Sequence, residues 1–385
     1  MSDILFEIKE ENLETGLRGY PIGYCTTSTV DPIKGLFYAE IPIPQLASWE
    51  PEKVIYLLYQ GREGSESEVA QFTQDMRKRA NCSADTIKYI QALPRTGHPM
   101  QLFAASLLVS GMIEWTNNYR EDCLNLIAQI PQLAAATINY HAGWGKTPES
   151  RPELGYMENF TQMVNVPNGD KKKLGDVFKL FNVLHYDHGG GNLSTFVGKA
   201  VASSLENMHG SLSSAMCALA GPLHGKANQE ALEFVKRILT DLGENATTEQ
   251  MDSYLRQLIE KKELLYGFGH AVLRVEDPRA KVLYDMAEKE YPNNPLVKIS
   301  LLLRKEGSKV LKENPKISNP FPNVDAISGT LLSAAGFPYP EYFTLLFGLS
   351  RVVGIAIQIV YERCDARDGK GTPLVRPKYI YKSRY

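Results

Sequence analysis

Apolar side chains recur every three or four residues along most of this chain, the spacing that places them on one face of an α-helix. The pattern begins near Pro51 in PEKVIYLLYQG and continues in MQLFAASLLVSGMIEW and REDCLNLIAQIPQLAAATINYHAGW. Proline, or serine followed by acidic residues, stands where the first helices would begin, as is typical of helix N-termini. The segment before Pro51, rich in Gly, Pro, Thr, Tyr and Ile, favours one or two short hairpins at most. The sequence therefore predicts a mainly α-helical fold.

The balance of charged and apolar residues changes along the 385-residue chain and suggests two domains. Residues 226–316 are dense in charge, as in RQLIEKKELL and LLLRKEGSKVLKENPK, and predict shorter helices with a solvated face. The chain then returns to strongly apolar helices, ISGTLLSAAG and YFTLLFGLSRVVGIAIQIVYE. We predict a large helical domain made of residues 1–225 and 326–385, with a smaller domain of residues 226–325 inserted into it. A cleft between two such domains is a favoured place for a ligand.

Charge and composition narrow the functional classes. The 42 Lys and Arg residues nearly balance the 44 Asp and Glu residues, so no basic field favours nucleic acid. The sequence predicts no apolar run of membrane-spanning length. The acidic N-terminus MSDILFEIKEENLETG has neither a secretory signal nor an Arg-rich transit pattern. We expect a soluble protein that binds neither nucleic acid nor a membrane. It would belong in a prokaryotic cytoplasm or, after removal of a leader, in an organelle matrix.

Cysteine and histidine spacing gives little support to a metal site. The five cysteines are odd in number and include no Cys-x-x-Cys pair, and Cys217, in SSAMCALAG, is expected to be buried. His185, Asp187 and His188 in FNVLHYDHGGGN form a candidate metal site, but no further ligands follow at the usual spacing. Three- and four-residue steps across residues 174–188 predict that both histidines share a helix face that runs into three glycines. We predict no bound metal, a core role for His185 and a ligand-binding role for His188.

Two further histidines lie in glycine-rich turns. His224 follows the small-residue run SLSSAMCALAG and stands between Pro222 and Gly225 in GPLHGK. His224 could present its ring to a cleft or could be a plain turn residue, and the segment alone leaves both alternatives open. His270 follows Gly-Phe-Gly in LLYGFGHAVLRVEDPRA, which brings backbone amides and an imidazole to one point. A Gly-x-Gly pair by itself is weak evidence of a ligand site.

One aspartate and three arginines complete the candidate set. Arg279, in DPR, suits a bidentate grip on a carboxylate or a surface salt bridge with a neighbouring acidic residue. Asp325, in NPFPNVDAISG, is either an N-cap or a carboxylate base. Arg351 interrupts the apolar run LLFGLSRVVGIAI, where a charge is costly unless it is paired or faces a ligand, and Arg376 could be an ordinary tail charge. Arginines that bind a small polycarboxylate, histidines that polarise carbonyl oxygens and an aspartate that removes a carbon-bound proton together suit a carbon–carbon condensation.

Six motifs occur in an order and at a spacing that resemble the citrate synthase family in its eukaryotic-type form. They are LHYDHGGGN, GPLHGKANQE, GFGHAVL with DPRA, PNVDAISG, SRVVG and VRPKYIY, and they cover about Phe178 to Tyr381. The resemblance implies an almost all-helical homodimer that condenses acetyl-CoA with oxaloacetate to give citrate and free CoA, without a cofactor. A 2-methylcitrate synthase that uses propionyl-CoA, and a non-catalytic CoA-sensing helical protein, are the alternatives.

The resemblance also implies a role for each matching residue. Asp325 would take a proton from the acetyl methyl group, His224 would hydrogen-bond the thioester oxygen, and His270 would polarise the oxaloacetate carbonyl and protonate the alkoxide. Two positions depart from the family pattern, Tyr266 in place of Pro and Lys226 in place of an apolar residue. The expected oxaloacetate ligands are His188, Arg279, Arg351 and, from the other subunit, Arg376, while Leu264, Leu265, Gly267 and Phe268 match the loop that packs on the CoA adenine.

Overall fold

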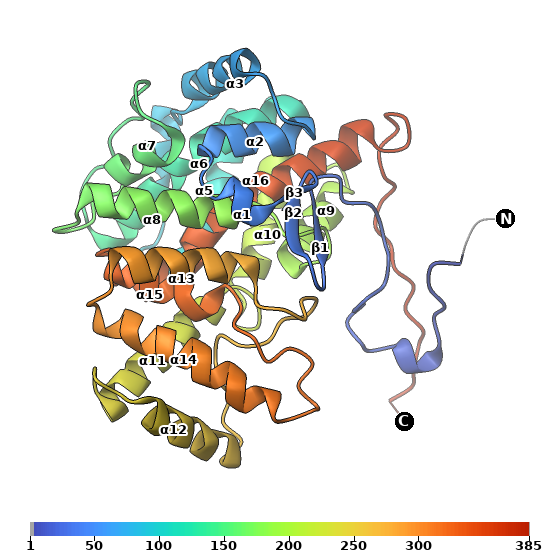
Figure 1. Ribbon diagram of the computed structural model, residues 1–385. Coiled ribbons are helices and arrows are strands. Elements are labelled where there is room, and N and C mark those ends of the chain that lie inside the picture. The colour runs from blue at the N-terminus through green and yellow to red at the C-terminus, as the bar shows by residue number, and fades with distance from the viewer. Residues whose placement is uncertain (1–3, 385) are drawn as a thin grey trace.

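The computed structural model describes residues 4–384 and shows the predicted mainly α-helical fold (Figure 1). A large body of helices occupies the upper part of that view, and a smaller group lies below it. The first ten helices are α1 (Ile43–Leu46), α2 (Pro51–Gln60), α3 (Glu66–Arg79), α4 (Ala84–Ile90), α5 (Pro99–Glu114), α6 (Tyr119–Ala142), α7 (Tyr156–Met163), α8 (Lys171–Leu184), α9 (Leu193–Ala202) and α10 (Met208–Leu219). The next six are α11 (Ala227–Leu242), α12 (Thr248–Glu260), α13 (Pro278–Glu290), α14 (Pro295–Lys312), α15 (Asp325–Ala334) and α16 (Phe343–Val360).

Local sequence signals explain where the early helices begin. Helix α2 starts at Pro51, whose missing N–H would have no partner in the first turn. Ser65 caps α3, because its hydroxyl accepts the Glu68 N–H while the Glu68 carboxylate reaches back to the Ser65 N–H. These two starts agree with the sequence prediction.

A three-stranded antiparallel sheet precedes the helices and agrees with the predicted hairpins. Its strands pair in the order β1-β2-β3, in the register that places Val30 opposite Leu36. Gly35, at the hairpin tip, has a φ of +95°, and a Cβ there would lie 2.7 Å from the Pro278 side chain. The sheet therefore braces the start of α13. The strands are β1 (Ser28–Asp31), β2 (Gly35–Tyr38) and β3 (Ile41–Pro42).

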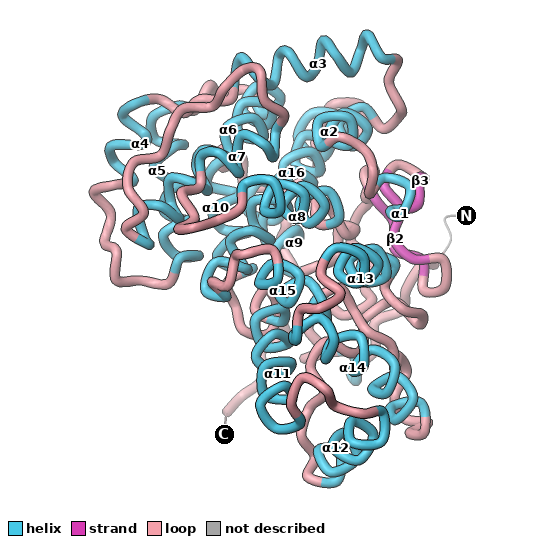
Figure 2. Tube along the Cα trace, turned by 60° about the vertical axis from the view of Figure 1, so that its left-hand side comes forward, coloured by secondary structure: helices cyan, strands magenta, loops and turns pink. Residues whose placement is uncertain are grey.

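Helix α16 runs through the centre of the body (Figure 2), and every residue of it except Phe347 is buried. With the short turns on either side, the segment Pro340–Asp365 is long and apolar enough to cross a membrane by length and composition. The sequence prediction that no apolar run reaches this length is therefore wrong. Because 94% of the apolar stretch is buried inside the protein, its composition is that of a core helix with neighbours on all sides.

The lower helices have an apolar cluster of their own. Helices α11, α12 and α14 bury one face each against one another, whereas α13 and α15 contribute to the core of the body. Packing alone does not establish which segments move together, so the predicted domains, 1–225 with 326–385 and 226–325, stay a prediction. The buried residues of the lower cluster are Phe234, Val235, Ile238, Met251, Leu255, Leu258, Ile299, Leu303 and Val310.

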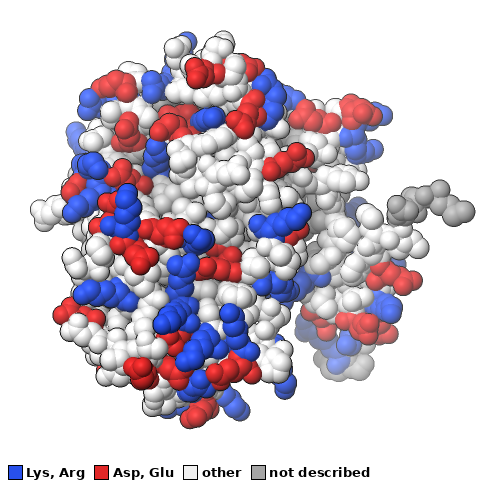
Figure 3. Space-filling view, in the orientation of Figure 1, with Lys and Arg blue, Asp and Glu red and all other residues white. Residues whose placement is uncertain are grey.

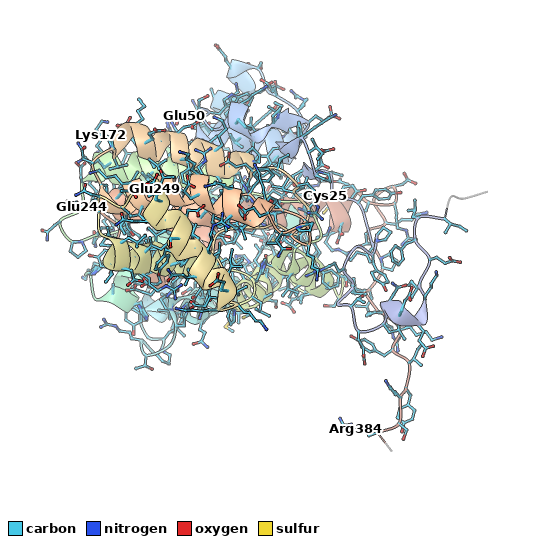
Figure 4. All side chains as sticks on the ribbon, turned by 60° about the horizontal axis from the view of Figure 1, so that its bottom comes forward. Cys25, Glu50, Lys172, Glu244, Glu249 and Arg384 are labelled. Carbon is cyan, nitrogen blue, oxygen red and sulfur yellow. The ribbon has the colours of Figure 1, made fainter. Side chains whose placement is uncertain are left out.

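Both ends of the chain leave the body. Residues 4–24 are mostly exposed and run near residues 372–384 on the right of Figure 1, and Figure 4 shows Arg384 well away from the helices. The two arms carry many apolar side chains that are exposed to solvent in the single chain. They include Ile4, Leu5, Phe6, Ile8, Leu17, Ile22, Leu374, Val375, Tyr379, Ile380 and Tyr381.

The surface shows one correction to the sequence analysis. Acidic and basic side chains are interspersed over the face seen in Figure 3, in agreement with the balanced composition. Cys217 is exposed, so the prediction of a buried thiol is wrong. Helix α10 turns Met216 and Leu219 into the core and Cys217 away from it. Small residues occupy both sides of this helix, so the sequence pattern did not distinguish its buried face.

Candidate active site

His185 and His188 lie close together in sequence but play different structural parts. Helix α8 ends at Leu184, so His188 lies in the loop beyond it, and the prediction of one shared helix face is wrong. The glycines that follow take the chain out of the helix, and Gly189 has a φ of +72°. His185 is buried and its Nδ1 donates to the Phe181 carbonyl at 2.7 Å, which is a core role as expected. The His188 ring instead lies 5.2 Å, centroid to centroid, from that of His270.

Arg351 is a buried cation on the central helix. Its side chain is 2% exposed, its Nε donates to the His185 carbonyl at 3.2 Å, and no carboxylate of residues 4–384 lies within ion-pair distance. Burial lowers its pKa to about 10, although the negative charge of Asp187 opposes that shift, so the guanidinium stays protonated at neutral pH. An unpaired buried charge is costly. Arg351 is therefore well suited to receive an anionic ligand.

Arg279 opens α13 and is buried as well. Its Nε and Nη2 donate to the two carboxylate oxygens of Asp277 at 3.1 and 2.7 Å. Of the two alternatives left open by the sequence, a salt bridge is thus present, but it is buried rather than at the surface. Glu276, the other nearby carboxylate, pairs with Arg304. Nη1 of Arg279 donates no hydrogen bond to any described residue, so the edge of the guanidinium that carries Nη1 is available to a second anion.

The protonation of His270 follows from its backbone contacts. The N–H groups of Val272 and Leu273 both donate to Nδ1, at 3.0 and 2.9 Å. Nδ1 is therefore an acceptor, and the proton of the neutral ring resides on Nε2. Burial, followed by the positive charge of Arg279, lowers the pKa of His270 to about 4. The ring is neutral at physiological pH and presents a single N–H donor.

His224 is held in the opposite tautomer. It lies in the turn between α10 and α11, where the Ser194 N–H donates to its Nε2 at 3.2 Å and the Ser194 hydroxyl lies 3.0 Å from the same atom. Because Nε2 accepts a backbone N–H, the proton is assigned to Nδ1. Burial, followed by the charge of Arg351, lowers the pKa of His224 to about 4. The turn thus presents a second neutral N–H donor rather than a plain turn residue.

Asp325 is the first residue of α15 but does not cap it. The N-cap residue is Val324, and the Asp325 side chain makes no capping hydrogen bond, so the N-cap interpretation of Asp325 is wrong. Its carboxylate accepts no hydrogen bond from the part of the chain that the structure describes. Burial raises the pKa of Asp325 to about 6, against the opposing charge of Arg279. A carboxyl group with a pKa close to neutral is well matched to general-base work.

The structure brings six of the seven predicted polar site residues into one region. The pKa of His188 is lowered well below its usual range by burial and by the charges of Arg279, Arg351 and His270, which reflects how near these groups lie. Arg376 is the exception. It is exposed on the C-terminal arm, next to Val375, whose N–H donates to the Ser203 hydroxyl at 2.9 Å. Within one chain, therefore, Arg376 does not join the others.

Three of the four predicted CoA-loop residues line a groove in the lower group of helices. The groove has a volume of about 560 Å³, and its lining includes Leu264, Leu265, Phe268 and Ile317. Leu264 is 71% exposed, so its side chain is open to solvent at the groove. Gly267 plays a different part, because it has a φ of +84° and a Cβ there would lie 2.7 Å from the Cα of Ala326.

Comparisons with known proteins agree with this geometry. The family model "Citrate synthase, C-terminal domain" matches residues 16–378. The chain is 34% identical to the mitochondrial citrate synthase of Citrus maxima, over 95% of this chain and 81% of that protein. It is 31% identical to the mitochondrial 2-methylcitrate synthase of Yarrowia lipolytica, over 99% of this chain and 86% of that protein.

The chain belongs to the citrate synthase family. Members of this family are acyltransferases, and this protein is accordingly an enzyme of that class. Its fold also matches a solved citrate synthase of Thermoplasma acidophilum, with a TM-score of 0.82 over 96% of both chains at 24% identity. That structure is a ternary complex with carboxymethyl coenzyme A and oxaloacetate. At this identity the match establishes the fold alone.

Several contacts of the site residues were not predicted from the sequence. Ser194, which sets the tautomer of His224, follows the glycine run but carries no signal that links it to a residue 30 positions away. Asp277, the buried partner of Arg279, was considered only as a surface neighbour. Among residues 4–384, no group of three or more His, Cys, Asp and Glu side chains is arranged to hold a metal ion.

Proposed function

We propose that this protein condenses acetyl-CoA with oxaloacetate and water to give citrate and free CoA. One observation carries the proposal. Two neutral histidines, each with its proton fixed on one nitrogen, share a region with a carboxyl group of pKa about 6 and two buried guanidinium groups. A proton acceptor, two N–H donors and two anion-binding cations are the groups that this condensation needs.

The chemistry follows from the protonation states. The Asp325 carboxylate takes a proton from the acetyl methyl carbon, while Nδ1–H of His224 donates to the thioester oxygen as negative charge develops there. The methyl carbon then forms a bond to the ketone carbon of oxaloacetate. Nε2–H of His270 polarises that ketone oxygen and protonates the resulting alkoxide. The proton that Asp325 took up makes good the one that His270 gave to the alkoxide, so both groups return to their starting states. Water finally hydrolyses the citryl thioester, which releases citrate, a proton and the thiol of CoA.

Substrate binding uses the remaining groups. Arg351 and the free edge of Arg279 bind the oxaloacetate carboxylates, and His188, whose ring lies beside that of His270, completes the oxaloacetate site. The acyl-CoA lies in the groove of Leu264, Leu265 and Phe268, with Gly267 shaping the loop. The complex of the Thermoplasma relative with a CoA analogue and oxaloacetate supports both substrates. We expect no metal or organic cofactor to be needed.

A homodimer explains the remaining arginine. In the dimer the partner subunit's Arg376 would reach the oxaloacetate site that this chain's own tail does not approach. The exposed apolar arms, together with Leu108, Met112 and Ile113 on α5, support a second copy of the chain as the covering partner. The mitochondrial names of the plant and yeast relatives favour an organelle matrix over a cytoplasmic location.

A steady-state assay tests the proposal directly. Pure protein with acetyl-CoA should release free thiol only when oxaloacetate is present, and the absence of such release would refute the condensation. The Yarrowia relative favours 2-methylcitrate synthase as the second candidate function. The ratio of kcat/KM for acetyl-CoA to that for propionyl-CoA separates the two, since a ratio below one would assign the protein to the second.

Mixed dimers test the role of Arg376. Arg376→Ala and Asp325→Ala homodimers should both be impaired. In a heterodimer of the two, one site combines an intact Asp325 with an intact Arg376 from the other chain, so activity should return. If mass measurement confirms the heterodimer and no activity returns, Arg376 does not act across the interface.

A further inference from the structure

The His270 loop and the Asp325 loop are joined over their whole length. The Gly269 N–H donates to the Phe321 carbonyl at 3.0 Å, and Phe268 pairs with Pro322 in an antiparallel bridge. The two loops, residues 266–273 and 319–325, lie far apart in sequence and carry the proposed carbonyl-polarising histidine and the proposed base. The separation of those two groups therefore depends on how the loops are held together.

Asn323 occupies the junction between the loops. Its backbone N–H donates to the Gly267 carbonyl at 2.9 Å, and its Nδ2 donates to the Gly269 carbonyl at 3.0 Å. Its Oδ1 accepts the backbone N–H of Asp325 at 3.0 Å. One short side-chain amide thus contacts both the residue before His270 and Asp325 itself. Both contacts require a side chain that carries a donor for the Gly269 carbonyl and an acceptor for the Asp325 N–H on the same short amide.

A second asparagine in the same loop provides an internal comparison. Asn319 is buried, its Nδ2 donates to the Leu273 carbonyl at 2.6 Å, and its Oδ1 accepts the Phe321 N–H at 2.9 Å. It therefore joins the same two loops with the same chemistry. Unlike Asn323, it has no contact with Asp325. Any effect common to both asparagines belongs to loop stability, and any effect particular to Asn323 belongs to the placement of the base.

We infer that Asn323 is a positioning residue, whose amide fixes Asp325 relative to His270 by bonding the Asp325 N–H and the Gly269 carbonyl at once. The inference rests on the proposed function, because it takes Asp325 as the base. Proton abstraction is sensitive to geometry, and a misplacement of about 1 Å can cost about 10²-fold in rate. Because the carboxylate of Asp325 receives no hydrogen bond from the described residues, its placement depends on the backbone that Asn323 holds.

The test compares N323A with N319A in the full-length enzyme. We expect N323A to lower kcat by about 10- to 100-fold, with KM for both substrates changed far less. With methyl-deuterated acetyl-CoA, its primary isotope effect on kcat should exceed that of the wild type, because a misplaced base makes proton abstraction more rate-limiting. N319A also loosens the join between the two loops, but it leaves the Asp325 N–H bonded to Asn323, so its isotope effect should stay near the wild-type value even where its melting temperature falls as much.

N323D is the second variant in case N323A does not fold. Aspartate is nearly isosteric with asparagine and keeps the acceptor toward the Asp325 N–H, but it loses the donor toward the Gly269 carbonyl. A raised isotope effect in either folded variant supports the inference. An unchanged isotope effect in both Asn323 variants, or an equal rise of the isotope effect in N323A and N319A, overturns it. An inactive wild-type protein would reject the proposed function instead, so the two failures are distinguishable.

Discussion

The site is assembled from two regions that hold their side chains in different ways. Arg351 rests on α16, which is buried along nearly its whole length, and His188 follows directly from a buried helix end. His270 lies in a loop next to the lower helices, and Asp325 begins α15 directly after a second loop. The first region is fixed by core packing, and the second by hydrogen bonds between loops.

This difference assigns different physical tasks to the two regions. A close-packed core can hold an unpaired guanidinium rigidly, since its neighbours cannot move aside to solvate it. Loops tied by a few hydrogen bonds hold groups that must exchange protons, and they adjust more easily when a substrate arrives. The predicted arrangement is a rigid anion-binding half that faces an adaptable acid–base half.

The largest expected effect is on the loop half, from Asp325→Ala or Asp325→Asn. Loss of a general base should lower kcat by about 10²–10⁴-fold, while KM changes little. Because Asp325 caps no helix, the melting temperature should not fall. Turnover and thermal unfolding measured on the same preparations check both expectations.

The effect of Asp325→Asn on stability should depend on pH. Folding raises the pKa of Asp325 to about 6. The ionised carboxylate therefore destabilises the folded state fully above about pH 6, and this effect disappears once the pH falls below the ordinary pKa of an aspartate. Asp325→Asn should therefore raise the melting temperature at alkaline pH but not in acid. A fall of about 1 kcal/mol in stability, with turnover nearly kept, would instead indicate a capping residue.

The next effect is on the core half, from Arg351→Gln. Loss of a charge-assisted hydrogen bond costs about 1.5–3 kcal/mol, so kcat/KM for oxaloacetate should fall by about 10- to 150-fold. Stability should hold or rise, because an unpaired buried cation is removed. Arg304→Gln is the control, since Arg304 makes a partly exposed pair with Glu276 and should leave oxaloacetate affinity unchanged. If the Arg351→Gln variant is less stable than the wild type but binds oxaloacetate normally, Arg351 has a structural role and does not bind the substrate.

The two halves also differ in how far the sequence predicted them. Apolar periodicity predicted the mainly helical fold, because that pattern records which face of a helix is buried. It did not show where α8 ends, since His185 and His188 continue its spacing after the backbone has left the helix. The apolar surroundings of Arg351 indicated a buried charge, which the structure shows, while its role toward a ligand stays a prediction.

The loop half was less predictable from residue patterns. Asp325 is compatible with a cap or a base, and the choice depends on where the hydrogen bonds around it go, which a sequence does not record. The contacts of Ser194 with His224 and of Asn323 with Gly269 join residues 30 and 54 positions apart. Such pairs follow from the tertiary arrangement of loops, and no local spacing encodes them.

A smaller effect should follow from Gly267→Ala, which disturbs the packing of the loop half against α15. Both a φ of +84° and a Cβ 2.7 Å from the Ala326 Cα oppose the substitution. Gly243→Ala is a matched control, because Gly243 has a φ of +80° but no atom within 4 Å of its added Cβ. Both substitutions place a Cβ at a positive φ, and each carries backbone strain on the order of 1–3 kcal/mol. We expect only Gly267→Ala to lower kcat, by about tenfold for a displaced loop, and equal kinetics in both variants would argue against this packing role.

The smallest effect is the pH dependence of the unmodified enzyme, which distinguishes the acid–base half from the binding half without any mutation. Asp325 must be ionised to accept a proton, so kcat/KM for acetyl-CoA, which reports the free enzyme, should be halved near its pKa of about 6 and fall further as the pH decreases. The pKa values of His224 and His270 are both lowered to about 4, so these rings stay neutral over the same range and keep their N–H donors. Arg351, with a pKa of about 10, stays charged throughout. The acid limb of kcat/KM should therefore be governed by one ionisation near pH 6, and Asp325→Asn should remove it from the residual activity. An acid limb near pH 4 would mean that protonation of a histidine limits turnover, and that Asp325 is already ionised through the range in which the wild type works.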